Sequence, residues 1–215
     1  AKGRVIYIGK AKVLKKRVQS YFTRRLDSKT QVMVAKVVDL EYILTPTEVQ
    51  AQILEAALIK ERQPQYNIDL KDDKSFPWIR ITREEFPVVS ICRRKKQGKE
   101  DTSLYFGPYT NAKLLRQAIK AIRKIFGFRS CKNMPDKICL YGRMELCPAP
   151  CVNRISRKEY GEIIKEIGLF LESRYADLLE ELSRKMNLAS QEKEFEEAAN
   201  IRDQANALSA FASTS

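Results

Sequence analysis

Four side chains suited to phosphate chemistry gather near the start of the sequence: Tyr7, Lys10, Arg17 and Tyr21. They surround a junction where a β-branched strand, Val5 to Ile8, turns through Gly9 into a basic helix. A phenol, an ammonium and a guanidinium at one junction can hold a phosphate and move a proton beside it. A P-loop is excluded, because the two positions that this motif needs as Gly and as Ser or Thr hold Arg4 and Ala11. Two plainer interpretations remain open: a strand aromatic at Tyr7 and a solvated basic helix face.

A single carboxylate interrupts an apolar helix further along the chain. Glu55 lies within the run from Ile53 to Ile59, which is otherwise apolar. The side chain is either at the edge of the apolar stripe or a buried functional group. Helical periodicity fits both interpretations equally well.

The hydrophobic pattern that must position these residues predicts an α+β fold. It predicts strands at residues 4–9, 39–44, 78–82 and 88–93, and helices at 12–22, 48–62 and 112–126. The stretch Thr45 to Glu48 offers a Thr helix cap and an acidic first turn, and Pro64 ends that helix. Gln31 to Val38 fits a helix or a strand. From Ser156 onward we expect helices that end in a C-terminal hairpin, followed by a disordered tail at 212–215.

Composition narrows the class of protein. The sequence has 215 residues and a formal net charge of +13. Residues 1–70 carry a net +6 and residues 71–151 a net +10, whereas residues 152–215 carry −3. This asymmetry favours nucleic acid as the partner of the basic part and a protein as the partner of the acidic part. The absence of His excludes His bases and Cys/His zinc sites. No apolar run could span a membrane and no signal segment opens the chain, so we expect a cytoplasmic protein.

Basic side chains on two predicted helices are candidates for DNA contact. The helix at 112–126 has one apolar side and one basic side, the latter formed by Arg116, Lys120, Arg123 and Lys124. This basic side either only keeps the helix soluble or binds DNA phosphates, with Tyr105, Phe106 and Tyr109 contacting bases or sugars. The first helix adds three further candidates: Lys12, Lys15 and Lys16.

Four of the five cysteines lie within 21 residues: Cys131, Cys139, Cys147 and Cys151. Four thiolates suit a tetrahedral site for a soft metal, either Zn²⁺ or an iron–sulfur cluster. The spacing lacks the paired CxxC of a zinc ribbon, so it does not choose the metal. The alternative is four reduced, unligated thiols. Cys92 stands apart in a predicted strand, where we expect it in the core.

Several stretches in this order resemble the nuclease module of the GIY-YIG family. They are Tyr7-Ile8-Gly9-Lys10-Ala11, the helix with Arg17 and Tyr21-Phe22, Ile53-Leu54-Glu55-Ala56-Ala57, and Pro64-Gln65-Tyr66-Asn67. The version they resemble is that of the UvrC family of bacterial nucleotide excision repair. Residues 71–77, Tyr105 to Tyr109 and the cysteines extend the resemblance over nearly the whole chain. The family's first strand, with its own tyrosine, would precede residue 1, so we expect a piece of a longer protein that lacks one active-site tyrosine.

The resemblance implies a role for each polar candidate. Tyr7 would be the general base, and Lys10 would favour its phenolate and touch the phosphate. Arg17 would clamp the scissile phosphate. Tyr21 would position substrate or water, and Asn67 would be a supporting polar contact.

The resemblance also implies two metal centres and an activity. Glu55 would hold a single Mg²⁺ or Mn²⁺, which would compensate a charge buried in an apolar helix. The four cysteines would hold a [4Fe-4S] cluster, with Zn²⁺ as the alternative. The expected activity is the 3′ incision at lesions in damaged double-stranded DNA, made together with the partner UvrB. The alternative is a catalytically inactive module that binds DNA and docks on UvrB.

The sequence Phe-Glu-Glu-Ala-Ala-Asn-Ile-Arg-Asp at 195–203 resembles the UVR motif, by which the family docks on UvrB. The expected contact residues are Phe195, Ala198, Ala199, Arg202 and Leu208. An ordinary amphipathic helix explains their spacing equally well. We expect four regions: a nuclease domain at 1–70, a basic middle region with the cysteines at 71–155, a helical connector at 156–187, and a partner-binding helix and tail at 188–215.

Overall fold

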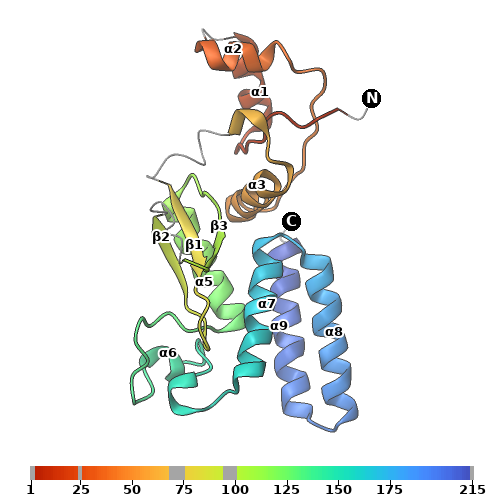
Figure 1. Ribbon diagram of the computed structural model, residues 1–215. Helices are drawn as coiled ribbons and strands as arrows, with labels where there is room; N and C mark the ends of the chain where they lie inside the picture. Colours follow the sequence, from red (N-terminus) through yellow and green to blue (C-terminus); the bar gives the residue numbers. More distant parts are fainter. Residues whose placement is uncertain (1–2, 24–25, 68–75, 94–100, 214–215) are drawn as a thin grey trace.

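The computed structural model describes residues 3–23, 26–67, 76–93 and 101–213, and it confirms the predicted α+β class (Figure 1). The helices are α1 (Leu14–Thr23), α2 (Ser28–Val34), α3 (Glu48–Arg62), α5 (Ala112–Phe126), α6 (Leu140–Arg143), α7 (Arg157–Leu171), α8 (Tyr175–Gln191) and α9 (Phe195–Ser213). Two short 3₁₀ turns, η1 (Gln65–Asn67) and η2 (Pro150–Val152), and three strands, β1 (Pro77–Ile81), β2 (Val89–Arg93) and β3 (Leu104–Phe106), complete the described elements.

Side-chain caps fix the start of the helices that carry the site. Thr47 Oγ1 accepts a hydrogen bond from the backbone N–H of Gln50, and the Gln50 side chain accepts one from the backbone N–H of Thr47, so α3 opens with a capping box. Its end is Gln63, which adopts a left-handed conformation with φ 47°. Asn111 accepts from two backbone N–H groups at the start of α5, and Gly127 ends it. The predicted helices at 48–62 and 112–126 are therefore confirmed to the residue.

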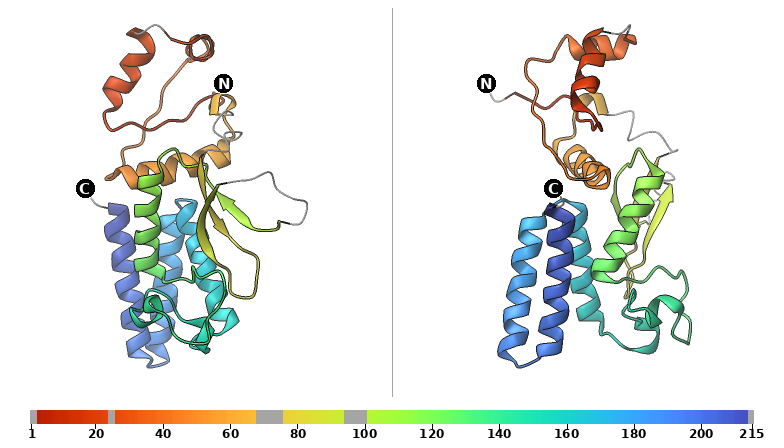
Figure 2. Two further views of the ribbon diagram at one scale, coloured as in Figure 1. Left: turned by 90° about the vertical axis from the view of Figure 1, so that its left-hand side faces the viewer. Right: turned by 180° about the vertical axis from the view of Figure 1, so that it is seen from behind.

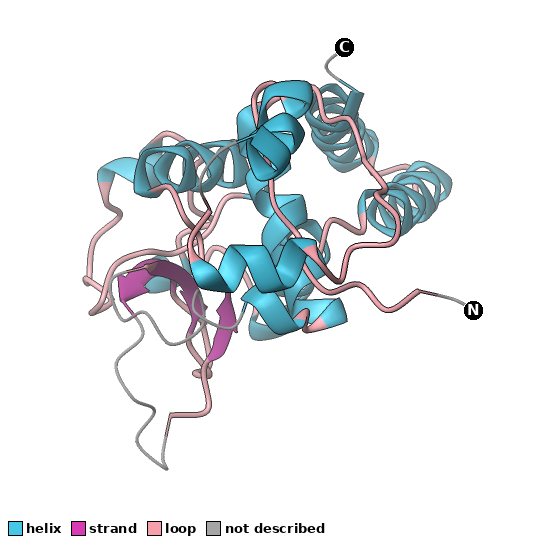
Figure 3. Cartoon of the chain, turned by 90° about the horizontal axis from the view of Figure 1, so that it is seen from above, coloured by secondary structure: helices cyan, strands magenta, loops and turns pink. Residues whose placement is uncertain are grey.

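A three-stranded antiparallel sheet with the order β2-β1-β3 forms one side of the molecule (Figure 3). Ile79 of the central strand pairs with Ile91 on one side and Phe106 on the other. The strands predicted at 78–82 and 88–93 are confirmed. Strand β3 is a third strand that the hydrophobic pattern does not predict, because three residues are too few for a period.

Two segments predicted as strands enter no sheet in the described part of the chain: residues 4–9 and 39–44. A strand needs a neighbour that pairs with its backbone N–H and C=O groups. Residues 39–44 instead expose apolar side chains, among them Tyr42 at 69% and Leu44 at 77%. The ambiguous stretch at 31–38 is the end of α2 and an irregular segment. Local apolar composition alone therefore predicts strands where the described part of the chain provides no pairing neighbour.

One hydrophobic core joins α3 to the sheet, to α5 and to the C-terminal helices. Ile53 and Ala56 of α3 are buried in the same cluster as Ile79 of β1 and Leu115 of α5. Helices α1 and α2 lie on the far side of α3 from this core (Figures 1 and 2). The elements that carry the site thus rest on a scaffold built from both the first region and the middle region.

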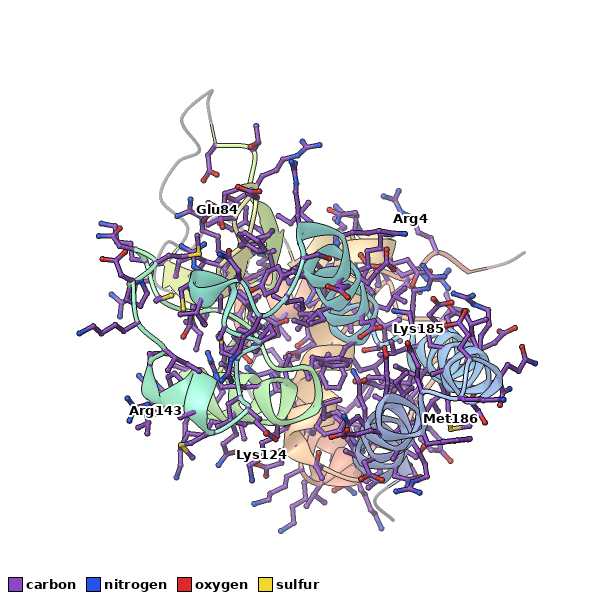
Figure 4. The ribbon with its side chains drawn as sticks, turned by 90° about the horizontal axis from the view of Figure 1, so that it is seen from below. Arg4, Glu84, Lys124, Arg143, Lys185 and Met186 are labelled. Carbon is purple, nitrogen blue, oxygen red and sulfur yellow. The ribbon has the colours of Figure 1, made fainter. Side chains whose placement is uncertain are left out.

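Helices α7, α8 and α9 form an antiparallel bundle whose upper end lies below α3 (Figures 1 and 2). Phe170 is fully buried between the rings of Phe126, Tyr175 and Phe211, at centroid distances of 5.8, 5.4 and 4.9 Å. Lys185 of α8, labelled in Figure 4, donates to the buried carboxylate of Glu166 at 2.7 Å. No described helix combines the length and the apolar character that a membrane span requires.

The structure has a turn between α7 and α8, where the hydrophobic pattern predicts no break in the helix. Ser173 there and Lys193 between α8 and α9 both have positive φ, 58° and 64°, without being Gly. In each turn a backbone N–H bonds back to a carbonyl five residues earlier, from Arg174 to Leu169 and from Glu194 to Ala189. Without a Gly signal the first break is invisible in the sequence.

The predicted disordered tail is wrong through Ser213, which is helical, and its last two residues lie outside the described residues.

Candidate active site

Tyr7, Arg17 and Tyr21 meet in the structure, as the sequence led us to expect. The hydroxyl of Tyr21 donates to Tyr7 Oη at 3.3 Å, and Arg17 Nη2 donates to the same oxygen at 3.5 Å. The two tyrosine rings meet edge to face with centroids 6.2 Å apart, and the Arg17 guanidinium lies 5.1 Å from the centre of the Tyr21 ring. Tyr7 Oη is therefore the shared acceptor of the cluster.

The protonation of Tyr21 follows from its surroundings. Burial first, and then the hydrogen bond to Tyr7, raises the pKa of Tyr21 to about 12. The hydrogen bond to Tyr7 also raises the pKa of the Arg17 guanidinium. At neutral pH both groups keep their protons and act as hydrogen-bond donors to Tyr7 Oη.

Gly9 makes room for Tyr7. A Cβ atom at position 9 would lie 2.8 Å from Tyr7 Oη and 2.9 Å from Tyr7 Cε1. Such contacts are closer than van der Waals distance, so the phenol can fold over the backbone only because residue 9 has no side chain. Gly9 thus allows the Tyr7 hydroxyl to take the position it has in the structure.

Lys10 and Glu55 form the second half of the site. Lys10 Nζ lies 2.5 Å from Glu55 Oε2, and the Glu55 side chain is only 10% exposed. The carboxylate therefore lies inside α3's packed face, not at the edge of its apolar stripe. Lys10 Nζ also lies 2.5 Å from Thr110 Oγ1. Thr110 is absent from the predicted site residues, and its only signal in the sequence is that it follows the Tyr105 to Tyr109 stretch.

Asn67 holds the backbone between the two halves. Its side-chain Oδ1 accepts from Ile8 N at 2.8 Å, and its Nδ2 donates to Ile8 O at 2.7 Å. The backbone N–H of Tyr66 adds a bond to Ile6 O at 2.9 Å. Asn67 is buried, so both ends of its amide are used on the chain and none faces solvent. The supporting role expected for Asn67 has this concrete form.

The donor set of Glu55 fits a hydrated divalent cation. No three Asp, Glu, Cys or His side chains of the described residues converge on a metal position. Mg²⁺ keeps most of its waters and is commonly held by one or two carboxylates together with substrate phosphates. A single buried carboxylate, such as Glu55, is enough to hold such a hydrated ion. A cage made entirely of protein ligands is not required.

The four clustered cysteines lie around α6 and η2, and all are free thiols. Burial first, and then the nearby thiols of Cys139, Cys131 and Cys151, raises the pKa of Cys147. The thiols are thus neighbours with the right chemistry for a soft metal, but among the described residues they are not drawn together as a ligand set. Cys92 is half-buried in β2, so its expected core position is only partly met.

The basic side of α5 divides into two parts. Arg116, Lys120 and Lys124 are exposed along one side of the helix, and Figure 4 labels Lys124. Arg123 instead lies 4.1 Å from the Phe128 ring and 4.5 Å from the Tyr141 ring, and donates to Phe128 O at 2.9 Å. Burial lowers its pKa. The Arg123 guanidinium thus makes its contacts within the protein, and the expected contact of Arg123 with DNA stays a prediction.

The aromatic residues before α5 are structural. Tyr109 is 1% exposed and Phe106 is 5% exposed, so neither can stack on a base. Tyr105 donates a hydrogen bond from its hydroxyl to Asp101.

On α1, Lys15 and Lys16 are exposed as expected, whereas Lys12 pairs with Glu48 at 2.9 Å.

A shallow groove of about 250 Å³ lies between α8 and α9. Its lining includes Met186, labelled in Figure 4, and Phe195, Ala198, Ala199 and Arg202. Phe195 is 67% exposed at the bundle's free end. Leu208, the fifth expected contact residue, is fully buried in the core, and its role in partner binding stays a prediction.

Three family models match the chain in succession. Residues 1–68 match the UvrC-like GIY-YIG domain, residues 76–170 the middle domain of the UvrC/Cho excinucleases, and residues 176–211 the UvrB/uvrC motif. No solved structure matches the chain significantly. The third match spans both α8 and α9, so the motif begins earlier than the helix at 188–215 expected to carry it. Because the three matches follow one another over most of the sequence, the chain belongs to the UvrC-like proteins of DNA repair.

Proposed function

We propose that the protein is a metal-dependent DNA endonuclease that makes the 3′ incision at lesions in nucleotide excision repair, together with UvrB. Two observations carry the proposal: Tyr21 and Arg17 both donate to Tyr7 Oη, and Lys10, three residues further along the chain, pairs with the buried Glu55. The match of residues 1–68 to a UvrC-like GIY-YIG domain supports a nuclease role.

The side chains divide the work of phosphodiester hydrolysis. Tyr7, acting as its phenolate, takes the proton of the attacking water and becomes a neutral phenol, and Tyr21 orients Tyr7 by the hydrogen bond it donates. Arg17 and Lys10 place positive charge at the phosphate, where negative charge grows in the transition state. Glu55 would hold a divalent cation, which would supply charge neutralisation and assistance to the leaving oxygen.

The direct test is nicking of a duplex that carries one lesion and one end label, with UvrB and Mg²⁺ or Mn²⁺. The assay compares this chain with a form extended at its N-terminus by the family's first strand. We expect a nick 3′ of the lesion, and we expect EDTA to abolish the nicking. Phe195→Ala is expected to lower the nicking rate, because Phe195 lines the groove between α8 and α9. Absence of metal-dependent nicking in both forms would contradict the proposal.

A second candidate is a DNA-binding and UvrB-docking module without catalysis. It is favoured by the row of exposed basic side chains on α5, which are Arg116, Lys120 and Lys124. For the triple change of these residues to Gln we expect the logarithmic salt dependence of DNA binding to flatten by about 0.9 for each phosphate that the protein no longer neutralises.

The matched control changes Lys158, Arg184 and Lys193 to Gln, which removes the same charge from the C-terminal helices and their borders. We expect this control to keep the wild-type slope. Equal slopes for both triple variants in a filter-binding titration over KCl would exclude α5 as the DNA surface.

We also propose that Cys131, Cys139, Cys147 and Cys151 hold one metal centre, a [4Fe-4S] cluster or Zn²⁺. Support comes from the four neighbouring thiols and from Arg129, which is buried and fixes the carbonyls of Cys131 and Lys132 at 3.2 and 3.0 Å. Anaerobically purified protein is expected to contain iron or zinc, and Cys147→Ser to lose it. Neither metal above background in elemental analysis would refute the centre.

A further inference from the structure

A residue of the middle region touches the lysine of the candidate nuclease site. Lys10 Nζ lies 2.5 Å from Glu55 Oε2 and 2.5 Å from Thr110 Oγ1. We propose that Thr110 is a positioning residue, which keeps the Lys10 ammonium in place when a cation engages Glu55. This inference rests on the proposed nuclease function and assigns part of the site to the region that follows the GIY-YIG domain.

Thr110 is held from both sides along the chain. The backbone N–H of Tyr109 bonds to Pro77 O at 3.0 Å, and the Tyr109 side chain is buried. On the other side, Asn111 caps α5, and its carbonyl accepts from Gln52 Nε2 of α3 at 2.9 Å. Because both neighbours are fixed, the hydroxyl of Thr110 stands at a defined point beside α3.

Glu55 is fixed to the same scaffold. Ile53 and Ala56, on either side of it in α3, are buried in the core that includes Ile79 of the sheet and Leu115 of α5. The spacing between Glu55 and Thr110 is therefore set by core packing and by the bond between Gln52 and Asn111.

The number of N–H donors on the Lys10 ammonium explains why two acceptors, Glu55 and Thr110, can hold it and still leave a donor for substrate. Lys10 has three N–H donors, of which one points to Glu55 and one to Thr110, so a third is left for a phosphate oxygen. A cation on Glu55 would repel the ammonium, and a lysine stem is flexible enough to swing into solvent. A neutral hydroxyl keeps the ammonium near the phosphate without competing for the cation.

The test follows the ammonium group of Lys10 itself by ¹H–¹⁵N NMR of the full chain, with Lys10→Arg to assign the signal. In Thr110→Val we expect the protons of the Lys10 ammonium to exchange with water about tenfold faster. This is the magnitude expected for the loss of one charge-assisted hydrogen bond at an exposed position. At saturating Mg²⁺ the signal is expected to persist in the wild type and to vanish in Thr110→Val. Thr110→Ser, which keeps the hydroxyl, is expected to restore both behaviours.

Thr102→Val is the matched control, because it removes an exposed hydroxyl from the same region without a contact to Lys10. Exchange in Thr110→Val equal to the wild type, or failure of Thr110→Ser to restore protection, would overturn the role of Thr110. If Mg²⁺ leaves the Glu55 carboxyl ¹³C signal unmoved, the metal role in the proposed function fails, while the measurement without Mg²⁺ still tests Thr110.

Discussion

Replacing Glu55 by Gln is expected to reduce metal-dependent nicking by about a thousandfold or more. The amide keeps the size of the side chain and can still accept from Lys10, but it loses the negative charge that a hydrated Mg²⁺ requires. A bound cation contributes several kcal/mol to transition-state stabilisation, and about 1.4 kcal/mol corresponds to a factor of ten in rate. The measurement is the single-turnover nicking rate, in the form of the protein that nicks, over a range of Mn²⁺ concentrations.

Glu61→Gln provides the control for this change. Glu61 lies on the same helix and pairs only with the exposed Arg62 beside it among the interactions described, so the same chemical change there should leave the rate unaltered. Thermal unfolding of Glu55→Gln should show that the core around α3 is intact. Wild-type nicking and wild-type Mn²⁺ dependence in Glu55→Gln would refute the cation role of Glu55.

Replacing Tyr7 by Phe is expected to slow nicking by about a hundredfold to ten-thousandfold, the contribution typical of a positioned general base. Phe keeps the ring that meets Tyr21 edge to face and removes only the oxygen on which Tyr21 and Arg17 converge. The effect is therefore expected in the rate of the chemical step, with DNA affinity unchanged. Tyr42→Phe, at an exposed position, is the control.

The same variant carries a prediction about pH. Both the hydrogen bond to Tyr7 and the charge of a Tyr7 phenolate raise the pKa of Tyr21, so in Tyr7→Phe that pKa is expected to fall below about 12. Burial, the largest cause, remains and should keep it above the ordinary value near 10. Titration of the tyrosine absorbance at 295 nm, with Tyr21→Phe to identify the transition, checks the direction. An unchanged pKa would mean that the two hydroxyls do not interact.

Local signals in the sequence predict most of the helical frame. The helix at 48–62 follows from its Thr cap, its acidic first turn and Pro64, and the helix at 112–126 from an apolar row that repeats every three to four residues. These features act within one turn of the chain, so they need no tertiary context. The order of residue types around Tyr7, Lys10, Arg17 and Glu55, together with the UVR-like stretch at 195–203, suffices to indicate the family.

Signals that depend on a neighbour predict less. Residues 4–9 and 39–44 are rich in the β-branched and apolar residues typical of strands, yet strand pairing is a property of two segments. Neither segment enters a sheet in the part of the chain that the structure describes. The turn at Ser173 has a left-handed residue without Gly, stabilised by the bond from Arg174 to Leu169. Leu208 and Arg123 have the spacing of surface contacts, but packing against other elements takes both into the protein.

The functional groups of this protein and their order along the chain can be read from short motifs, because they are covalent facts. Which of these groups meet follows from the packing of the elements. It buried Glu55 against Lys10, turned Tyr21 and Arg17 as donors toward Tyr7, and placed Thr110 beside Lys10 from a hundred residues away in the chain. The physical reason is that a shared core between α3, the sheet and α5 fixes distances that no local pattern encodes.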